Sequence, residues 1–165
     1  MVDAFNREIG RIDVGVRALE VTSSLDGPQA RFRHEGLVLP MPSVLESHGT
    51  RQFLKLYPLL SDTLTTGSLV IIDELDAAIH SMLLSEIIGW FHGPDRNRHS
   101  AQLWMSCHNA SVLEDPSKDE IVLCDKGWRG RTETYCLNDV KAVRRDDSHH
   151  KKYLGGVSGG VPRIG

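Results

Sequence analysis

The feature that most constrains the fold is the run SLVIIDELD at residues 68–76, in which a short apolar stretch ends on Asp73 and Glu74. Apolar runs without alternation are typical of parallel strands, which are buried on both faces. The carboxyl ends of such strands form the edge at which open α/β sheets bind ligands. The sequence therefore predicts that both acids lie at a ligand-binding sheet edge.

A second apolar run, QLWMSC at 102–107, follows the first after a helix-like segment over 78–92. The earlier segment 47–64 also has apolar residues at helical spacing, although Pro58 must either kink that helix or be accommodated in it. Short apolar strands separated by helices indicate an α/β fold. We expect a parallel sheet with helices on both of its faces.

Shorter elements flank this core and add a few antiparallel strands. Before it we expect the end of a helix at 2–10, a strand at 11–21, a turn at 23–29, and a short strand pair at 30–36 and 37–40. After it we expect strands at 119–126 and 131–137, a turn at 127–130, and a helix at 149–154. A glycine-rich tail follows at 155–165.

Composition excludes several classes of protein. The chain has 165 residues, enough for one domain, and its net charge of -3 gives no overall attraction to nucleic acid. No segment approaches the roughly 20 continuous apolar residues that cross a bilayer, and the N-terminus lacks an export signal, so we expect a cytoplasmic protein without membrane contact. Cys107, Cys124 and Cys136 form no CxxC pair, which predicts buried free thiols.

The two acids suit nucleotide hydrolysis. Neighbouring side chains on a strand point to opposite sides, so Asp73 and Glu74 should contact different partners. In a hydrolytic site Asp73 would hold Mg²⁺ through water, and Glu74 would orient or deprotonate the attacking water. The alternative is that Asp73, Glu74 and Asp76 only cap the free N–H groups at the start of the following helix, where negative charge also suits the helix dipole.

Two neighbouring stretches favour the hydrolytic interpretation. ESHGT at 46–50 places Ser47 and Gly49 at a helix N-terminus, where backbone N–H groups can bind phosphate oxygens. SCHN at 106–109 places His108 at the same sheet edge as Glu74, where a ring nitrogen could contact a γ-phosphate. Taken singly, Ser47 is equally an ordinary N-cap, and His108 a polar residue at a strand end.

Together, ESHGT, SLVIIDELD and SCHN resemble the signature motif, Walker B motif and switch-histidine loop of ABC-type ATPase domains. The nearest resemblance is to the AAA-named bacterial ATPases related to the overcoming-lysogenization-defect and abortive-infection proteins. It extends over about Val2 to Pro162 and includes the ending KKYLGGVSGGVP. It implies a P-loop NTPase-like (ABC/SMC-type) core of which only the second half is present, over residues 1–154.

The resemblance also implies roles for individual residues. Asp73 would be the Mg²⁺-side aspartate, Glu74 the catalytic glutamate and His108 the switch histidine. Nucleotide contacts would come from the signature and from the loop that faces a partner subunit: Ser47, Gly49, Thr50 and His80. The implied ligands are ATP and Mg²⁺.

The largest departure from the family pattern is that the phosphate-binding loop motif GxxxxGK[ST] is absent from the sequence. Smaller departures are His48 in the signature, Ser81 after the loop histidine and Ser158 in the closing motif. The phosphate-binding loop supplies most of the grip on the phosphates. We therefore expect the isolated chain neither to bind ATP tightly nor to hydrolyse it.

Completion of the site would require a longer ATPase or a partner chain that bears the Walker A motif. The resemblance implies a head-to-tail dimer that drives an effector protein, and phage defence is a family-level association.

One alternative is a non-catalytic scaffold or regulatory domain that keeps the ATPase fold. Another is a metal-dependent nuclease that uses Asp73, Glu74, His80 and the His149–His150 pair. Basic residues within 144–152, among them Arg145, provide weak support for a DNA contact.

Overall fold

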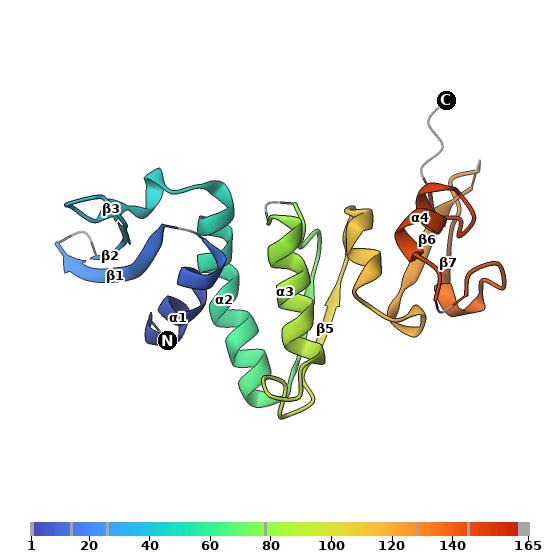
Figure 1. Cartoon of the computed structure of the whole chain (residues 1–165), viewed down its shortest axis with the longest axis horizontal. Coiled ribbons are helices and arrows are strands. Elements are labelled where there is room, and N and C mark those ends of the chain that lie inside the picture. Colours follow the sequence, from blue (N-terminus) through green and yellow to red (C-terminus); the bar gives the residue numbers. More distant parts are fainter. Residues whose placement is uncertain are drawn as a thin grey trace.

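The computed structural model describes residues 2–13, 15–25, 27–77, 79–127, 129–144 and 146–161. Several expectations include other positions, which lie outside the described residues: Val14 in the predicted strand at 11–21, Asp26 in the turn at 23–29, Ala78 at the predicted helix start, Trp128 in the turn at 127–130, Arg145 of the basic segment, and the tail from Pro162 onward. The molecule is elongated, with an antiparallel sheet at one end, a parallel α/β unit in the middle and a small third unit at the other end (Figure 1).

The middle unit is formed by α2 (His48–Thr66), β4 (Leu69–Ile72), α3 (Ser81–His92) and β5 (Gln102–Met105). Strands β4 and β5 are parallel, with Ile72 paired with Met105, as the apolar runs predicted. Helix α2 continues through Pro58 and ends at Gly67, whose φ of 71° suits glycine. The chain therefore returns twice to the same sheet edge, after β4 and after β5.

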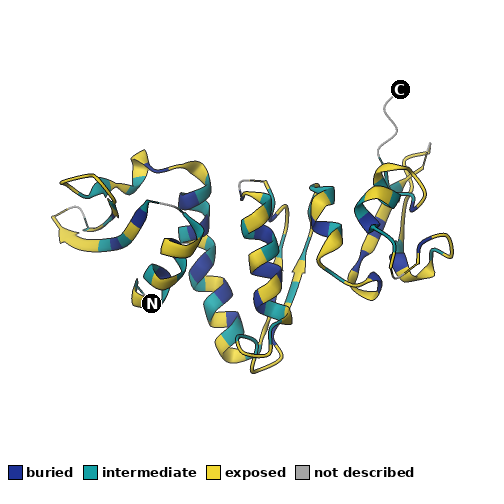
Figure 2. Cartoon of the chain, in the orientation of Figure 1, coloured by how far each residue is buried: buried dark blue, intermediate teal, exposed yellow. Residues whose placement is uncertain are grey.

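Only one face of this parallel sheet is covered, so the expectation of helices on both faces is wrong for the described residues. Val70 and Leu84 are buried in the core that α2 and α3 build on that face. On the opposite face the side chains of Leu69, Ile71 and Trp104 are 53%, 72% and 64% exposed. We call these three residues the open sheet face (Figure 2). A sheet of two strands leaves apolar side chains in water unless further polypeptide covers them.

The first sheet contains β1 (Val16–Ser24), β2 (Gly27–His34) and β3 (Met41–Pro42), all antiparallel. Helix α1 (Val2–Ile12) packs beside it and extends two residues into the predicted strand at 11–21. The predicted strand at 37–40 is wrong, because that segment is an irregular loop with Leu37, Val38 and Leu39 exposed. Phe5, Phe32 and Phe53 join α1, this sheet and α2 in one core.

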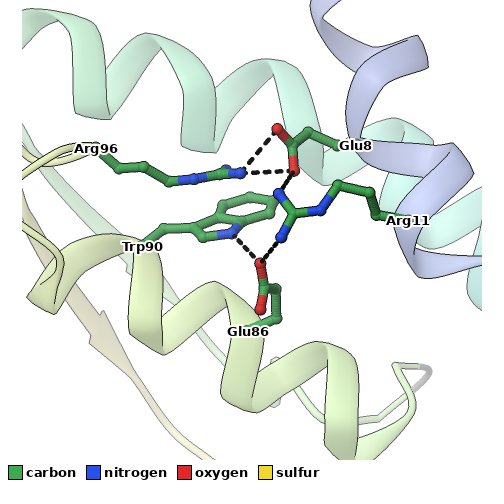
Figure 3. Close-up of polar contacts among 5 residues, drawn as sticks. All are labelled: Glu8, Arg11, Glu86, Trp90 and Arg96. Carbon is green, nitrogen blue, oxygen red and sulfur yellow. Dashed lines mark hydrogen bonds and ion pairs between the residues drawn. The ribbon is translucent and has the colours of Figure 1, made fainter.

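Polar contacts connect α1 to α3 and to the loop after it (Figure 3). One guanidinium nitrogen of Arg96 donates to both carboxylate oxygens of Glu8 at 2.8 Å, and the guanidinium carbon lies 4.7 Å from the centroid of the Trp90 ring. The Trp90 ring nitrogen donates to Glu86 at 3.2 Å, and Arg11 contacts both Glu8 and Glu86. This network fixes the position of the loop that begins at Gly93.

The third unit contains β6 (Val122–Lys126), β7 (Thr132–Cys136) and α4 (His149–Leu154) around its own small core. The glycine-rich tail packs on it up to Gly160, since the Tyr135 hydroxyl donates to the Ser158 carbonyl at 2.9 Å and the Tyr153 hydroxyl donates to the Gly160 carbonyl at 3.1 Å. All three cysteines are free, as predicted, but the prediction that they are buried is wrong: Cys107 and Cys136 are half-buried and Cys124 is exposed. Within the described ranges, no helix is long and apolar enough to span a membrane.

Candidate functional site

The acid pair lies in the turn that follows β4, and Ser106 at the end of β5 fixes its geometry. The Ser106 hydroxyl donates to Oδ1 of Asp73 and accepts a hydrogen bond of 2.8 Å from the backbone N–H of Glu74. The main chain of Ser106 also bonds with Ile72 and Leu75 on either side of the acids. Glu74 has a φ of 49°, a conformation that non-glycine residues adopt at a cost and that clusters at functional sites.

The predicted acid and histidine come together. Nε2 of His108 lies 3.5 Å from Oε1 of Glu74, and the two side chains are 81% and 58% exposed. An ion pair this exposed contributes little to stability, about 0–1 kcal/mol. Both side chains therefore remain available to a ligand or a water molecule at the sheet edge.

Asp76 organises the histidine loop. Its Oδ2 accepts hydrogen bonds from the backbone N–H groups of His108 at 3.0 Å and Asn109 at 2.8 Å. Helix α3 begins at Ser81 and is capped by His80, whose Nδ1 accepts from the backbone N–H of Met82 at 3.3 Å. The acids thus do not cap this helix, so the helix-capping alternative for Asp73, Glu74 and Asp76 is wrong. His80 remains exposed.

The signature residues form the start of α2. Ser47 is the N-cap, with its hydroxyl accepting a hydrogen bond of 3.0 Å from the backbone N–H of Thr50. The next two N–H groups, of His48 and Gly49, have no acceptor among the residues that the structure describes. Such N–H groups, together with the helix dipole, suit an anion. The capping interpretation of Ser47 is confirmed, and it is compatible with phosphate contact.

Contacts among Ser47, Thr50 and Asp13 set the orientation of the Ser47 hydroxyl. Thr50 is buried, and its hydroxyl donates to Oδ2 of Asp13 while lying 2.7 Å from the Ser47 hydroxyl. A threonine hydroxyl has one proton, so Ser47 must be the donor in the contact between the two hydroxyls. Ser47 would therefore have to rotate in order to donate to a phosphate oxygen.

The predicted residues gather at one end of the middle unit but in two groups. Asp73, Glu74 and His108 form one group, and Ser47 with Thr50 forms the other at the start of α2. Both groups lie at the end where β4 and β5 finish and α2 begins (Figure 1). Among the described residues no hydrogen bond or ion pair connects the two groups.

The acid pair suits a hard cation only as part of a larger ligand set. Exposed carboxylate and hydroxyl oxygens, as in Asp73 and Ser106, are ligands that Mg²⁺ accepts, and it needs about six oxygens. No group of three or more His, Cys, Asp or Glu residues within the described ranges could hold a metal ion. His149 is buried in the third unit with Nδ1 against the Leu113 carbonyl, so the nuclease site proposed with the acid pair is not assembled.

Sequence reasoning missed Ser106, Asp13 and the role of Asp76. Ser106 was detectable, because the register that pairs Ile72 with Met105 puts Asp73 beside Ser106 on the neighbouring strand. Asp13 carried no such signal, since its contact with Thr50 spans 37 residues between elements of different type.

A thiol also lies beside this loop. Burial raises the pKa of the Cys107 thiol to about 11, and the negative charge of Asp76 adds to the increase. Cys107 is therefore protonated near neutral pH and makes a poor nucleophile.

Comparison with known families identifies the family of this chain. A family model described as "AAA domain, putative AbiEii toxin, Type IV TA system" matches residues 3–114, a range that includes both groups of site residues. No curated protein matches the chain. The match agrees with the mixed α/β architecture and indicates a P-loop NTPase-like fold and an ATPase-like, nucleotide-binding function. The chain belongs to the family of AbiEii toxin-like AAA domains, which are ATPase-like and related to abortive infection proteins.

Proposed function

We propose that this chain provides the acid, histidine and signature portion of an ATP-hydrolysing site, and that polypeptide bearing a phosphate-binding loop completes it. The observation that carries the proposal is the exposed Glu74–His108 pair at the carboxyl edge of β4 and β5, with Asp73 held beside it by Ser106. Parallel strands in open α/β sheets bind ligands at that edge.

In this proposal Glu74 orients and deprotonates the attacking water. Its carboxylate is exposed, and its backbone N–H donates to the Ser106 hydroxyl. The Glu74 side chain can therefore change rotamer while its main chain stays in place. His108, 3.5 Å away, would donate to the γ-phosphate. Mg²⁺, when bound, neutralises phosphate charge, and Asp73 would hold it through water. A positioned general base contributes about 10²–10⁴ in rate.

The open sheet face supports the need for further polypeptide. Leu69, Ile71 and Trp104 are all more than half exposed, and neither outer edge of the β4–β5 sheet is paired within the described residues. A segment that adds a strand to this sheet would cover the apolar face. It would also bring a phosphate-binding loop to the end where Glu74 lies.

The signature group would then serve a second nucleotide. No hydrogen bond or ion pair joins Ser47 or Gly49 to the acid pair in the described residues, which suits an arrangement in which the N-terminus of α2 contacts a γ-phosphate held by another subunit. We propose a head-to-tail dimer of this kind, with Thr50 holding Ser47 and with His80 at the subunit boundary.

The test is a complex of this chain with a polypeptide that carries a GxxxxGK[ST] loop, joined by fusion or co-expression. Glu74→Gln should lower turnover by about 10²-fold or more and leave MgATP bound, because the side chain keeps its size but loses its basicity. The exposed Glu133 on β7 is a matched control, and Glu133→Gln should turn over normally. Rapid turnover by Glu74→Gln would exclude the proposed role.

A non-catalytic scaffold is the second candidate, and the open sheet face is the observation that favours it. A scaffold needs that face but not the acid. Glu74→Ala should then leave the assembled complex and its cellular effect unchanged, whereas Trp104→Ala should weaken assembly.

A further inference from the structure

A hollow of about 300 Å³ lies at the opposite end of the parallel unit from the acid pair. Its floor and sides come from α2, α3 and the loop at 93–100: Tyr57, Ser61, Leu64, Thr65, Trp90, Asp95, Arg96, Arg98 and His99. Figure 1 shows this loop at the end where α2 finishes and β5 starts. The hollow is therefore separate from the nucleotide site proposed above, which lies where β4 and β5 end.

The loop beside the hollow is rigidly built. The Asn97 side chain donates to the carbonyls of Phe91 at 2.7 Å and Ala101 at 2.9 Å, and accepts from the backbone N–H of Ala101 at 2.6 Å. Gly67 lies so close that a Cβ there would come within 2.3 Å of the His99 carbonyl oxygen. Ser100 has a φ of 56°, a strained conformation that surrounding contacts must maintain. The backbone that carries Arg98 and His99 is thus already positioned for a ligand.

The basic side chains of the loop differ in how many interaction partners they have. The Arg96 guanidinium donates hydrogen bonds to Glu8 and lies over the face of the Trp90 ring (Figure 3). Arg98 uses only Nε, which donates to the Asp95 carbonyl at 3.0 Å. Within the described residues, no hydrogen bond or ion pair involves the two terminal nitrogens of Arg98 or the His99 ring. Both side chains are exposed at the rim of the hollow.

Neutral hydroxyls and buried aromatic rings complete the lining. Burial raises the pKa of the Tyr57 hydroxyl, with a further increase from Glu8, so that hydroxyl stays protonated. Trp90 and Tyr57 are 2% and 7% exposed, so their rings form a wall rather than a stacking platform. Asp95 is the acidic residue of the lining, and its carboxylate opposes an anion.

We propose that this hollow binds a phosphoryl group through the terminal nitrogens of Arg98 and the ring of His99. A guanidinium fork matches the oxygens of a phosphoryl group, and charge-assisted hydrogen bonds are the strongest available at a partly exposed site. The group could belong to a free phosphate or nucleotide, or to a nucleic acid backbone, and the experiment separates these sources.

The test follows backbone amide NMR signals of the whole chain during titration with inorganic phosphate, ATP and a single-stranded oligonucleotide at constant ionic strength. Each productive ligand should shift the amides of 95–100 and the ring N–H of Trp90. Arg98→Ala should weaken binding about tenfold, and Arg98→Lys by less. Asp95→Asn should strengthen it roughly threefold, because a like charge is removed. Arg129→Ala, a change at an exposed arginine outside the hollow, should have no effect.

The outcomes are distinct. If phosphate and ATP saturate the shifts at 95–100 and the oligonucleotide does not compete, the ligand is a free phosphate or nucleotide. If the oligonucleotide binds more tightly at the same amides, the ligand is a nucleic acid backbone. Absence of shifts at 95–100 with all three ligands, unchanged affinity in Arg98→Ala, or weaker binding in Asp95→Asn would overturn the proposal. Unfolding midpoints of the variants, measured in parallel, exclude loss of fold as the cause. Because the isolated chain is used, the result is independent of whether ATP is hydrolysed at Glu74.

Discussion

The Asp76 carboxylate holds the backbone of His108 across the sheet edge, through a hydrogen bond of 3.0 Å from the His108 N–H to Oδ2. The same oxygen accepts from Asn109 at 2.8 Å, so one carboxylate fixes two consecutive peptide groups. The turn after β4 and the loop after β5 are therefore one structural unit. The position of the His108 ring beside Glu74 depends on this link.

Asp76→Ala should loosen the histidine loop. The change leaves two backbone N–H groups without an acceptor, which should lower the free energy of unfolding by about 1–3 kcal/mol. Hydrogen exchange of the His108 and Asn109 amides should accelerate together, and chemical denaturation gives the stability. Asp62→Ala, at an exposed position on α2, is the control. Unchanged exchange at both amides would contradict the assigned role of Asp76.

The Cys107 thiol should make stability depend on pH. Its pKa is raised from 9.0 to about 11 in the folded chain by burial and by Asp76, so the folded state holds the proton more tightly than the unfolded state. Its contribution is fully present below pH 9.0 and should be lost as pH rises towards 11.

Denaturation of the wild type and of Cys107→Ala at a series of pH values isolates this contribution, because other groups titrate alike in both proteins. The difference in unfolding free energy between them should shrink above pH 9.0. A difference that is constant up to pH 11 would show that the thiol is not shielded.

Arg96→Ala should destabilise the junction of α1 with α3. The substitution removes the hydrogen bonds to Glu8 and the guanidinium over Trp90, and we expect a loss of about 1–2 kcal/mol in the free energy of unfolding. Arg129→Ala should change it by less than about 0.5 kcal/mol. Equal effects from the two substitutions, measured by urea denaturation, would mean that the network in Figure 3 adds no stability.

The sequence predicted the middle unit well, because its signals are local. Continuous apolar runs identified β4 and β5, and the cap residues Ser47 and Gly67 mark the ends of α2. The predicted proximity of Glu74 and His108 followed from one rule, that parallel strands share a carboxyl edge.

Other features depend on contacts between distant segments or on polypeptide that covers a surface. The contact of Asp13 with Thr50 joins separate elements and leaves no periodic pattern in the sequence. The sequence predicted that the open sheet face is buried, because Leu69–Ile72 lacks the alternation of apolar and polar residues that is expected of a half-exposed strand. A parallel strand has this composition when both of its faces are covered in the complete assembly.

Ile71→Glu should block assembly with the completing polypeptide while leaving this chain folded, because a charge replaces an exposed apolar side chain at the centre of the open sheet face. Assembly can be followed by the ¹⁹F signal of fluorotryptophan at Trp104, which should shift when that face becomes covered. Val44→Glu, at another exposed apolar position, is the control and should assemble normally. A Trp104 signal that is unchanged in the assembled complex would contradict coverage of this face.

The most direct measurement is single-turnover ATP hydrolysis by the completed complex, compared with that by Glu74→Gln and by the isolated chain. Our account predicts that the complex hydrolyses ATP, that Glu74→Gln retains ATP unhydrolysed, and that the isolated chain neither binds MgATP at submicromolar concentration nor hydrolyses it. Hydrolysis by Glu74→Gln at the wild-type rate, or tight MgATP binding by the isolated chain that persists in Arg98→Ala, would contradict the claim that Glu74 and His108 form half of a nucleotide-hydrolysing site.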